Sequence, residues 1–333
     1  MHAQKTPAAM LGRRALLTLA ALTPLLATPA LEAQTPTTAW PGKPIRIIVP
    51  YPAGGNSDAI GRFIAVKLGA ALGQPIIVEN KAGAGASIGT EAAARAPGDG
   101  YTLLIAPTAV FAITPHLRRV GYDPFTDFIP VAQLSGSYSI ATARKDAPFN
   151  SIAELVKAAS KAPDKYTFGS AGLATATHLT GEIVNYKTGI KMLHVPYKGS
   201  AEALSDLMGG RIDMIYDPVS LTQVKAGAVK AIGVLGKTRH PELPDVPTLK
   251  EQGYEVDMPA WYGLFAPKGT PKAIVEHAAA EVEKILKLPE TRSVLLKVSQ
   301  YPDFAGPAAF AAQIKVDSVF FKDLIKRANI HVE

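Results

Sequence analysis

The feature that most constrains this chain is a strand-like run that ends at a glycine pair and continues directly into a helix. Residues 45–49 (IRIIV) are mostly β-branched, as in a buried strand. Gly54 and Gly55 then allow backbone angles that a β-carbon forbids, and Asn56 or Ser57 can cap the helix that follows. A helix start with free N–H groups can hold a carboxylate or a phosphate. The alternative is that the loop only turns the chain, as in many parallel α/β units.

Two more units of this kind follow along the chain. The expected elements are helix 58–72, a second buried strand at 75–80, a glycine loop at 82–87, helix 88–95, strand 101–106 and a loop that contains Thr108. Consecutive strands with short helical connections predict a parallel, doubly wound sheet. Ligands of such sheets bind outside the carboxyl ends of the strands, where all three loops fall.

A nucleotide is a poor candidate for this ligand. Gly83, Gly85 and Gly89 resemble the dinucleotide pattern G-x-G-x-x-G, but the spacing is one residue too long. No acidic residue ends the next strand, as that pattern requires. A site for a small anion fits these residues better.

The alternation of strands and helices continues in the second half of the chain and indicates a second lobe. Residues 128–144 read as an extended crossing into that lobe, and residues 261–267 as the return. Thr270 is a candidate cap for the long helix after the return. The expected fold is therefore α/β with two lobes, each a mainly parallel sheet flanked by helices. The expected boundaries are 34–138 plus 260–333 for lobe 1 and 139–259 for lobe 2. Two crossings make a hinge that permits closure on a ligand.

The first 33 residues have the pattern of a cleavable secretory signal. Arg13 and Arg14 precede an apolar run that is short, interrupted by proline and ends in small residues. The general and the twin-arginine export routes both remain open. The chain has no cysteine, which excludes disulfides, thiolate metal sites and cysteine nucleophiles. Its formal net charge of +7 is dispersed, without the basic tract that nucleic-acid binding needs.

An ordered set of motifs connects the chain with a known family. The motifs are W-P-x-K-P at 40–44, Y-P-A-G-G-x-x-D-x-x-x-R at 51–62, V-E-N-x-x-G-A-G-x-x-x-G at 78–89, G-D-G-Y-T-L-L at 98–104, G-S-A-G-x-x-T-x-x-H-L at 169–179 and V-P-Y-K-G-S-A-x-A-L-x-D-L at 195–207. Together they resemble the Bug family, the TctC-like substrate-binding receptors of tripartite tricarboxylate transporters. The resemblance spans essentially all of the chain after the signal.

The resemblance implies a periplasmic receptor of the Venus-flytrap type, type II-like and monomeric, without a cofactor. It would hand a small carboxylated solute to the permease subunits of the transporter, and signalling to a membrane sensor stays open. The solute's carboxylate would be held mostly by backbone N–H groups. The residues implied to bind it are Tyr51, Pro52, Ala53, Gly54, Gly55, Ser57, Asp58, Asn80, Ala82, Gly83, Ala84, Gly85, Ser87, Thr108, Ser170, Ala171, Thr175, His178, Tyr197, Lys198 and Asp217. Gly61 and the Leu173-Ala174 pair depart from the family pattern. Contacts from the loop at 170–177, and the identity of the solute, therefore stay open.

The competing hypothesis is an exported α/β enzyme that acts on a small organic acid. Ser170 and His178 could suggest a hydrolase, but the sequence around Ser170 is not the nucleophile elbow G-x-S-x-G. In place of a role in binding or catalysis, Asp217 can be a helix cap and Lys198 a solvated turn residue. The histidines are scattered without paired carboxylates, which disfavours a metal site. We therefore expect no catalytic residue and no metal ligand.

Overall fold

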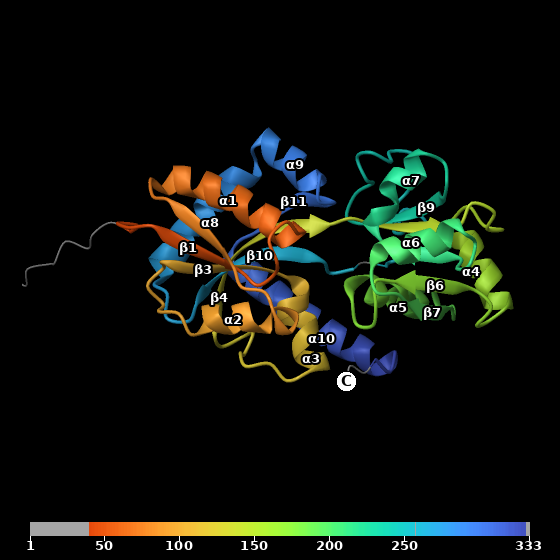
Figure 1. The fold of residues 1–333 in the computed structure, drawn as a ribbon, viewed down its shortest axis with the longest axis horizontal. Coiled ribbons are helices and arrows are strands. Elements are labelled where there is room, and N and C mark those ends of the chain that lie inside the picture. The colour runs from red at the N-terminus through yellow and green to blue at the C-terminus, as the bar shows by residue number, and fades with distance from the viewer. Residues whose placement is uncertain (1–39, 257, 331–333) are drawn as a thin grey trace, which may run out of the picture. The chain divides into compact units, whose positions relative to one another are not determined.

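The computed structural model describes residues 40–256 and 258–330, and these contain two β-sheets with flanking helices (Figure 1). The predicted signal peptide lies outside the described residues. The α/β class with two sheets, predicted from the sequence, is confirmed. Within the described residues, no helix combines the length and the apolar character that a membrane span requires.

The first sheet has six strands in the order β11-β4-β10-β3-β1-β2. The pairing shows that β1 to β4 run in one direction and that β10 and β11 run in the other. The sheet is therefore mixed, although most of its strands are parallel in direction. Its strands are β1 (Ile45–Val49), β2 (Ile76–Asn80), β3 (Thr102–Pro107), β4 (Phe128–Ser137), β10 (Trp261–Pro267) and β11 (Gln300–Ala305).

Helices cover both faces of this sheet, which explains why its central strands are apolar without interruption. Successive side chains of a strand point to opposite faces. Ile47 accordingly packs in one cluster with α1 and α8, and Ile48 packs in another with α2 and α10. The helices and helical turns on this part of the chain are α1 (Asn56–Leu72), η1 (Ala84–Ala86), α2 (Ser87–Ala94), η2 (Ala109–Ile113), α3 (Thr114–Leu117), α8 (Lys272–Leu286), α9 (Pro289–Leu296) and α10 (Pro307–Arg327).

The second sheet has five strands in the order β7-β6-β8-β5-β9, of which only β5 runs against the others. Phe168 and Met214 face a large apolar cluster that includes α4 and α5, and Ile215 faces α6. The strands are β5 (Ser139–Ala143), β6 (Thr167–Ser170), β7 (Leu193–Pro196), β8 (Met214–Tyr216) and β9 (Lys230–Leu235). The helices and the helical turn are α4 (Ile152–Lys161), α5 (Ala176–Thr188), α6 (Ser200–Met208), η3 (Pro218–Ser220) and α7 (Leu221–Lys225).

The chain passes between the sheets at two places. Residues 128–144, expected as an extended crossing, form β4 and β5, and residues 261–267, expected as the return, form β10 of the first sheet. β4 of the first sheet ends at Ser137 and β5 of the second begins at Ser139, so a single residue, Tyr138, separates them. The return enters the first sheet at Trp261, the first residue of β10. The α10 helix packs on the first sheet through Phe310, while Phe321 belongs to the cluster that contains the second sheet's core.

Several local predictions differ from the structure. The α1 helix is capped by the backbone of Gly55 and not by a side chain of Asn56 or Ser57. The Thr270 hydroxyl donates to the Pro267 carbonyl, and Pro271 is the cap of α8. The strand expected at 75–80 is an edge strand, with Ile77 60% exposed. The sequence reading also missed α9 and β11.

Candidate functional site

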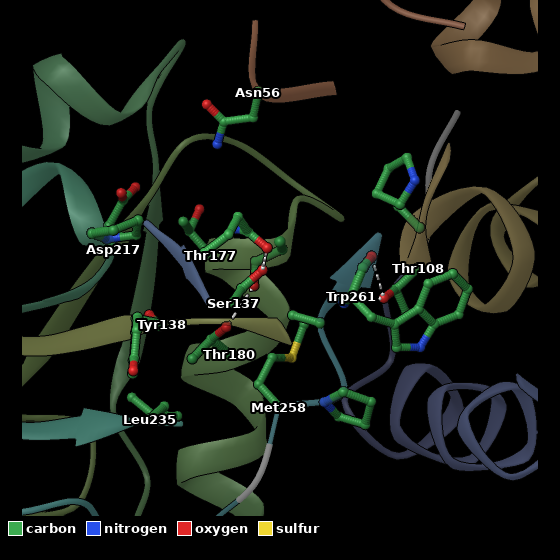
Figure 2. Close-up of a pocket in the computed structure, with 18 of the residues that line it drawn as sticks. Asn56, Thr108, Ser137, Tyr138, Thr177, Thr180, Asp217, Leu235, Met258 and Trp261 are labelled. Atoms are coloured by element: carbon green, nitrogen blue, oxygen red, sulfur yellow. Dashed lines mark hydrogen bonds between the residues drawn. The ribbon is translucent and has the colours of Figure 1, made fainter. Parts of the chain in front are cut away.

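One cavity among the described residues lies where strands of both sheets and the two crossings end. Its volume is about 270 Å³ (Figure 2). Its wall consists of loop residues, helix starts and the crossing segments. The lining residues are Asn56, Pro107, Thr108, Ala109, Ile113, Ser137, Tyr138, Ser139, Ala176, Thr177, Thr180, Ser200, Tyr216, Asp217, Pro218, Leu235, Met258, Pro259, Ala260, Trp261, Tyr262, Val298 and Gln300.

A second cavity, of about 520 Å³, adjoins the first. The two share Asn56, Pro107, Ala109, Ala176 and Tyr262, so we treat them as the inner and the outer part of one site. The outer part is lined in addition by Tyr51, Pro52, Ala53, Gly55, Ser57, Ala174 and Thr175. Burial raises the pKa of the Tyr262 phenol at the shared wall, which keeps that hydroxyl neutral.

Three α-helices begin at this site. The first residues of α1, α5 and α6, which are Asn56, Ala176 and Ser200, all line the inner cavity. The first N–H groups of a helix have no partner inside the helix and carry a partial positive charge. Among the described residues that line the two cavities, none is a lysine or an arginine. The positive potential of the site therefore comes from the backbone, which suits a small anion.

The first glycine loop is stabilised by an internal carboxylate. The N–H of Gly54 donates to the Asp58 carboxylate over 2.9 Å, and the Arg62 guanidinium contacts both oxygens of that carboxylate over 3.0 Å. Burial alone would raise the pKa of Asp58, but these hydrogen bonds outweigh it and hold the pKa below its usual value. Asn80 accepts from Arg62 and donates to the Tyr51 carbonyl. Asp58 and Asn80 thus shape the loop and do not line the cavities.

The second glycine loop lies away from both cavities. Ala82, Gly83, Ala84, Gly85 and Ser87 are absent from both linings. Gly85 has a φ of +58°, and a β-carbon there would lie 1.7 Å from an Arg118 nitrogen. The guanidinium of Arg118, on the segment after α3, therefore packs directly on this loop. No arginine was predicted at this position.

The loop at 171–175, which joins β6 to α5, is held by hydrogen bonds with side chains around it. Ser170 hydrogen-bonds to His194 over 2.6 Å, and the N–H of Ala171 donates to the Thr177 hydroxyl. Thr175 caps α5. His178 accepts from the N–H of Ala174 through Nδ1, so its proton is on Nε2. Thr175 lines the outer cavity, whereas Ser170, Ala171 and His178 line neither cavity.

His178 and His194 stack with their ring centroids 3.8 Å apart. Burial, together with the neighbouring His178, lowers the pKa of His194 to about 4. His194 hydrogen-bonds to Ser170 and His178 to Ala174, and neither ring lines a cavity. The two histidines therefore stabilise the loop and do not form a nucleophile–base pair that faces a substrate.

The remaining predicted residues divide between the cavity wall and the surrounding scaffold. Thr108 lines the inner cavity, but its hydroxyl accepts from the Trp261 N–H over 2.7 Å and donates to the Trp261 carbonyl over 3.2 Å. Tyr197 donates to Asp206, which helps burial to raise the pKa of Tyr197 to about 12. Lys198 is exposed. Neither Tyr197 nor Lys198 lines a cavity.

Among the described residues that line the inner cavity, Asp217 is the one acidic or basic residue, and it is only 7% exposed. It accepts from the N–H of Val219, which makes it the cap of η3, and from the Ser200 hydroxyl. Burial raises the pKa of this carboxyl, although these two hydrogen bonds oppose the shift.

Sequence reasoning identified part of the wall and missed the rest. The predicted residues that line a cavity are Tyr51, Pro52, Ala53, Gly55, Ser57, Thr108, Thr175 and Asp217. The missed wall comes mainly from the two crossings, such as Tyr138, Met258 and Tyr262. A usable signal existed, because crossings between two lobes must run past the space between them. Among the described residues, no group of three histidine, aspartate or glutamate side chains is placed to hold a metal ion.

The chain is similar to proteins of known family. The family model described as "Tripartite tricarboxylate transporter family receptor" matches residues 60–329. A protein from the tcbD–tcbE intergenic region of Pseudomonas sp. strain P51 is 38% identical over 332 residues, covering 98% of this chain and 97% of that protein. The periplasmic binding protein BugD has a TM-score of 0.67 and 35% identity, covering 88% of this chain and 100% of that chain.

Two similar structures carry a named ligand. Rpa4515 of R. palustris was solved with adipate and has a TM-score of 0.71 and 30% identity, covering 88% of this chain and 99% of that chain. MatC from Rhodopseudomonas palustris was solved with bound malate and has a TM-score of 0.66 and 29% identity, covering 86% of this chain and 99% of that chain.

Proposed function

Because the chain belongs to the tripartite tricarboxylate transporter receptor family, a family of solute-binding receptors and not of enzymes, we propose that it captures a small carboxylate between its two sheets. It then delivers this solute to the membrane permease of a transporter of that type. Relatives solved with adipate and with malate support a carboxylate as the solute.

The observation that carries the proposal is the set of helix starts at the site. Asn56, Ala176 and Ser200 bring three backbone N-termini to one cavity whose described wall contains no basic side chain. A carboxylate placed there replaces its water shell with fixed N–H donors, whereas a cation would meet an unfavourable potential. In this arrangement the backbone binds the acid, while the carboxyl of Asp217 on the same wall accepts hydrogen bonds from Ser200 and Val219.

The proposed cellular location rests on the family and on the predicted signal peptide. We place the protein in the periplasm as a monomer, after removal of a signal peptide at residues 1–33. Lobe 1 is proposed to be residues 34–138 plus 260–333, and lobe 2 residues 139–259, which puts the hinge at the two crossings.

Calorimetry on the purified protein tests the function. Each carboxylate in a panel that includes malate and adipate is compared with its uncharged amide. We expect at least one acid to bind with 1:1 stoichiometry, to raise the melting temperature and to be recovered unchanged, while its amide binds at least tenfold more weakly. Chemical conversion of an acid, or equal binding of acid and amide, would refute the proposal.

A further inference from the structure

The body of the inner cavity is apolar and aromatic. The aromatic residues among those that line it are Tyr138, Tyr216, Trp261 and Tyr262. The aliphatic part of the wall is made by Ile113, Leu235, Met258, Val298 and the prolines at 107, 218 and 259. Apolar surfaces of this kind favour a ring or an aliphatic body in the ligand.

Asp217 adds a negative charge to this wall. Figure 2 shows it among the residues that surround the cavity. Two neutral groups, the Ser200 hydroxyl and the Val219 N–H, donate hydrogen bonds to it. A carboxylate offers about four acceptor positions, so Asp217 can accept further hydrogen bonds from a ligand. A second carboxylate near it would instead be repelled, because the surroundings are largely desolvated.

The three helix starts differ in how far acidic residues of the chain already compensate them. The α6 helix begins at Ser200, whose hydroxyl donates to Asp217, and α1 carries Asp58 in its first turn. The α5 helix has no acidic residue in its first turn. Its first two residues, Ala176 and Thr177, line the inner cavity near Asn56. Of the three helix starts, that of α5 is therefore the most favourable place for a ligand carboxylate.

We propose that the solute of this receptor is a monocarboxylate with a ring or compact apolar body that carries a hydroxyl or amino donor. Its carboxylate binds at the start of α5, its body packs among the aromatic residues and its donor hydrogen-bonds to Asp217. The inference rests on the proposed function, since it assigns the solute class of that same site.

Calorimetry with four probes tests the assignment. The probes are 4-hydroxybenzoate and 4-aminobenzoate, which carry the donor, benzoate, which lacks it, and adipate, which has a second carboxylate. We expect at least one donor-bearing acid to bind tenfold or more tightly than benzoate and than adipate. We define the affinity ratio as the association constant of the donor-bearing acid divided by that of benzoate. Asp217→Asn should reduce this ratio at least fivefold. It should also improve adipate binding, because the repulsive charge is gone.

The matched control is Asp146→Asn, the same change at an exposed residue that does not line either cavity. It should leave all ratios within twofold of wild type. Tighter binding of adipate than of every ring acid overturns this inference while leaving the proposed function standing. Unchanged ratios in a folded Asp217→Asn variant also overturn it. Failure of every carboxylate to bind overturns the proposed function and this inference together.

Discussion

Asn56→Asp is the substitution that most directly tests whether backbone N-termini bind the solute. Asn56 is the first residue of α1, lines both cavities and is exposed. Its side-chain amide makes one long hydrogen bond, 3.3 Å, to the Val298 carbonyl. Aspartate has nearly the same shape, so the change adds a negative charge to the mouth of the site and little else.

The expected size of the effect follows from Coulomb's law. Two like charges about 5 Å apart repel each other by about 1 kcal/mol in a water-like dielectric and by about 3 kcal/mol at an effective dielectric constant of 20. Because Asn56 is exposed, the true value lies between these limits. The dissociation constant of a carboxylate should rise by about 5- to 150-fold. Folding should not suffer, since an acidic residue in the first turn stabilises a helix by about 0.3–1 kcal/mol.

Calorimetry at two salt concentrations separates charge from other causes. The Debye length shortens from about 8 Å at 0.15 M to about 3 Å at 1 M, so an electrostatic loss should shrink at high salt. Asn150→Asp, the same substitution at an exposed residue outside both linings, should bind normally. A dissociation constant for Asn56→Asp within twofold of wild type, with melting unchanged, would refute the idea that the α1 start is part of the anion site.

Three further predictions concern the scaffold around the site. Thr108→Val removes both hydrogen bonds to the buried Trp261 backbone and should lower the free energy of unfolding by about 2–4 kcal/mol in urea denaturation. Thr108→Ser keeps the hydroxyl and should retain most of the wild-type stability. Because the pKa of His194 is lowered to about 4, the unfolded chain takes up this proton first, so stability should fall by about 1–2 kcal/mol as the pH falls from about 6.5 to about 4. Removal of this ring in His194→Gln should flatten the dependence; an identical pH profile contradicts the assignment. Gly181→Ala places a β-carbon 2.1 Å from the Phe168 ring and should cost about 1–3 kcal/mol. Gly199→Ala meets no atom within 4 Å and should cost about 0.5 kcal/mol, because it only replaces the glycine cap of α6; equal melting of the two variants would contradict the packing.

The alternation of strand and helix was predictable because each central strand is buried on both faces. Residues 45–49 coincide with β1, and the strand expected at 101–106 differs from β3 by one residue at each end. Elements at the margins were less predictable, since their sequences carry a weaker pattern. β11 contains a proline and pairs through an irregular register with β4, and the edge strand β2 is half-exposed. Tertiary pairing, and not local sequence, determines these elements.

The candidate site was predictable as a region but not residue by residue. Glycine loops at strand ends indicated the correct edge of each sheet. Some of their amides, however, already donate to side chains a few residues away, such as Gly54 to Asp58 and Ala171 to Thr177. Periodicity and motif spacing carry no information about such pairings. The aromatic wall at Tyr138 and Tyr262 depends on where two distant crossings meet, which also requires the folded chain.

The internal hydrogen bonds of the loops have a consequence for binding energetics. Gly54, Ala171, Ala174 and Lys198 each donate their N–H to a side chain of the protein, so their loops do not need a solute to satisfy them. Loops that are already ordered lose little conformational entropy when a ligand arrives, which leaves more of the interaction energy for affinity. The groups left for the solute are then those of the helix starts. A receptor of this design should tolerate side-chain changes in the loops as long as the internal acceptor is kept, and should be sensitive to charge at the first residue of each helix.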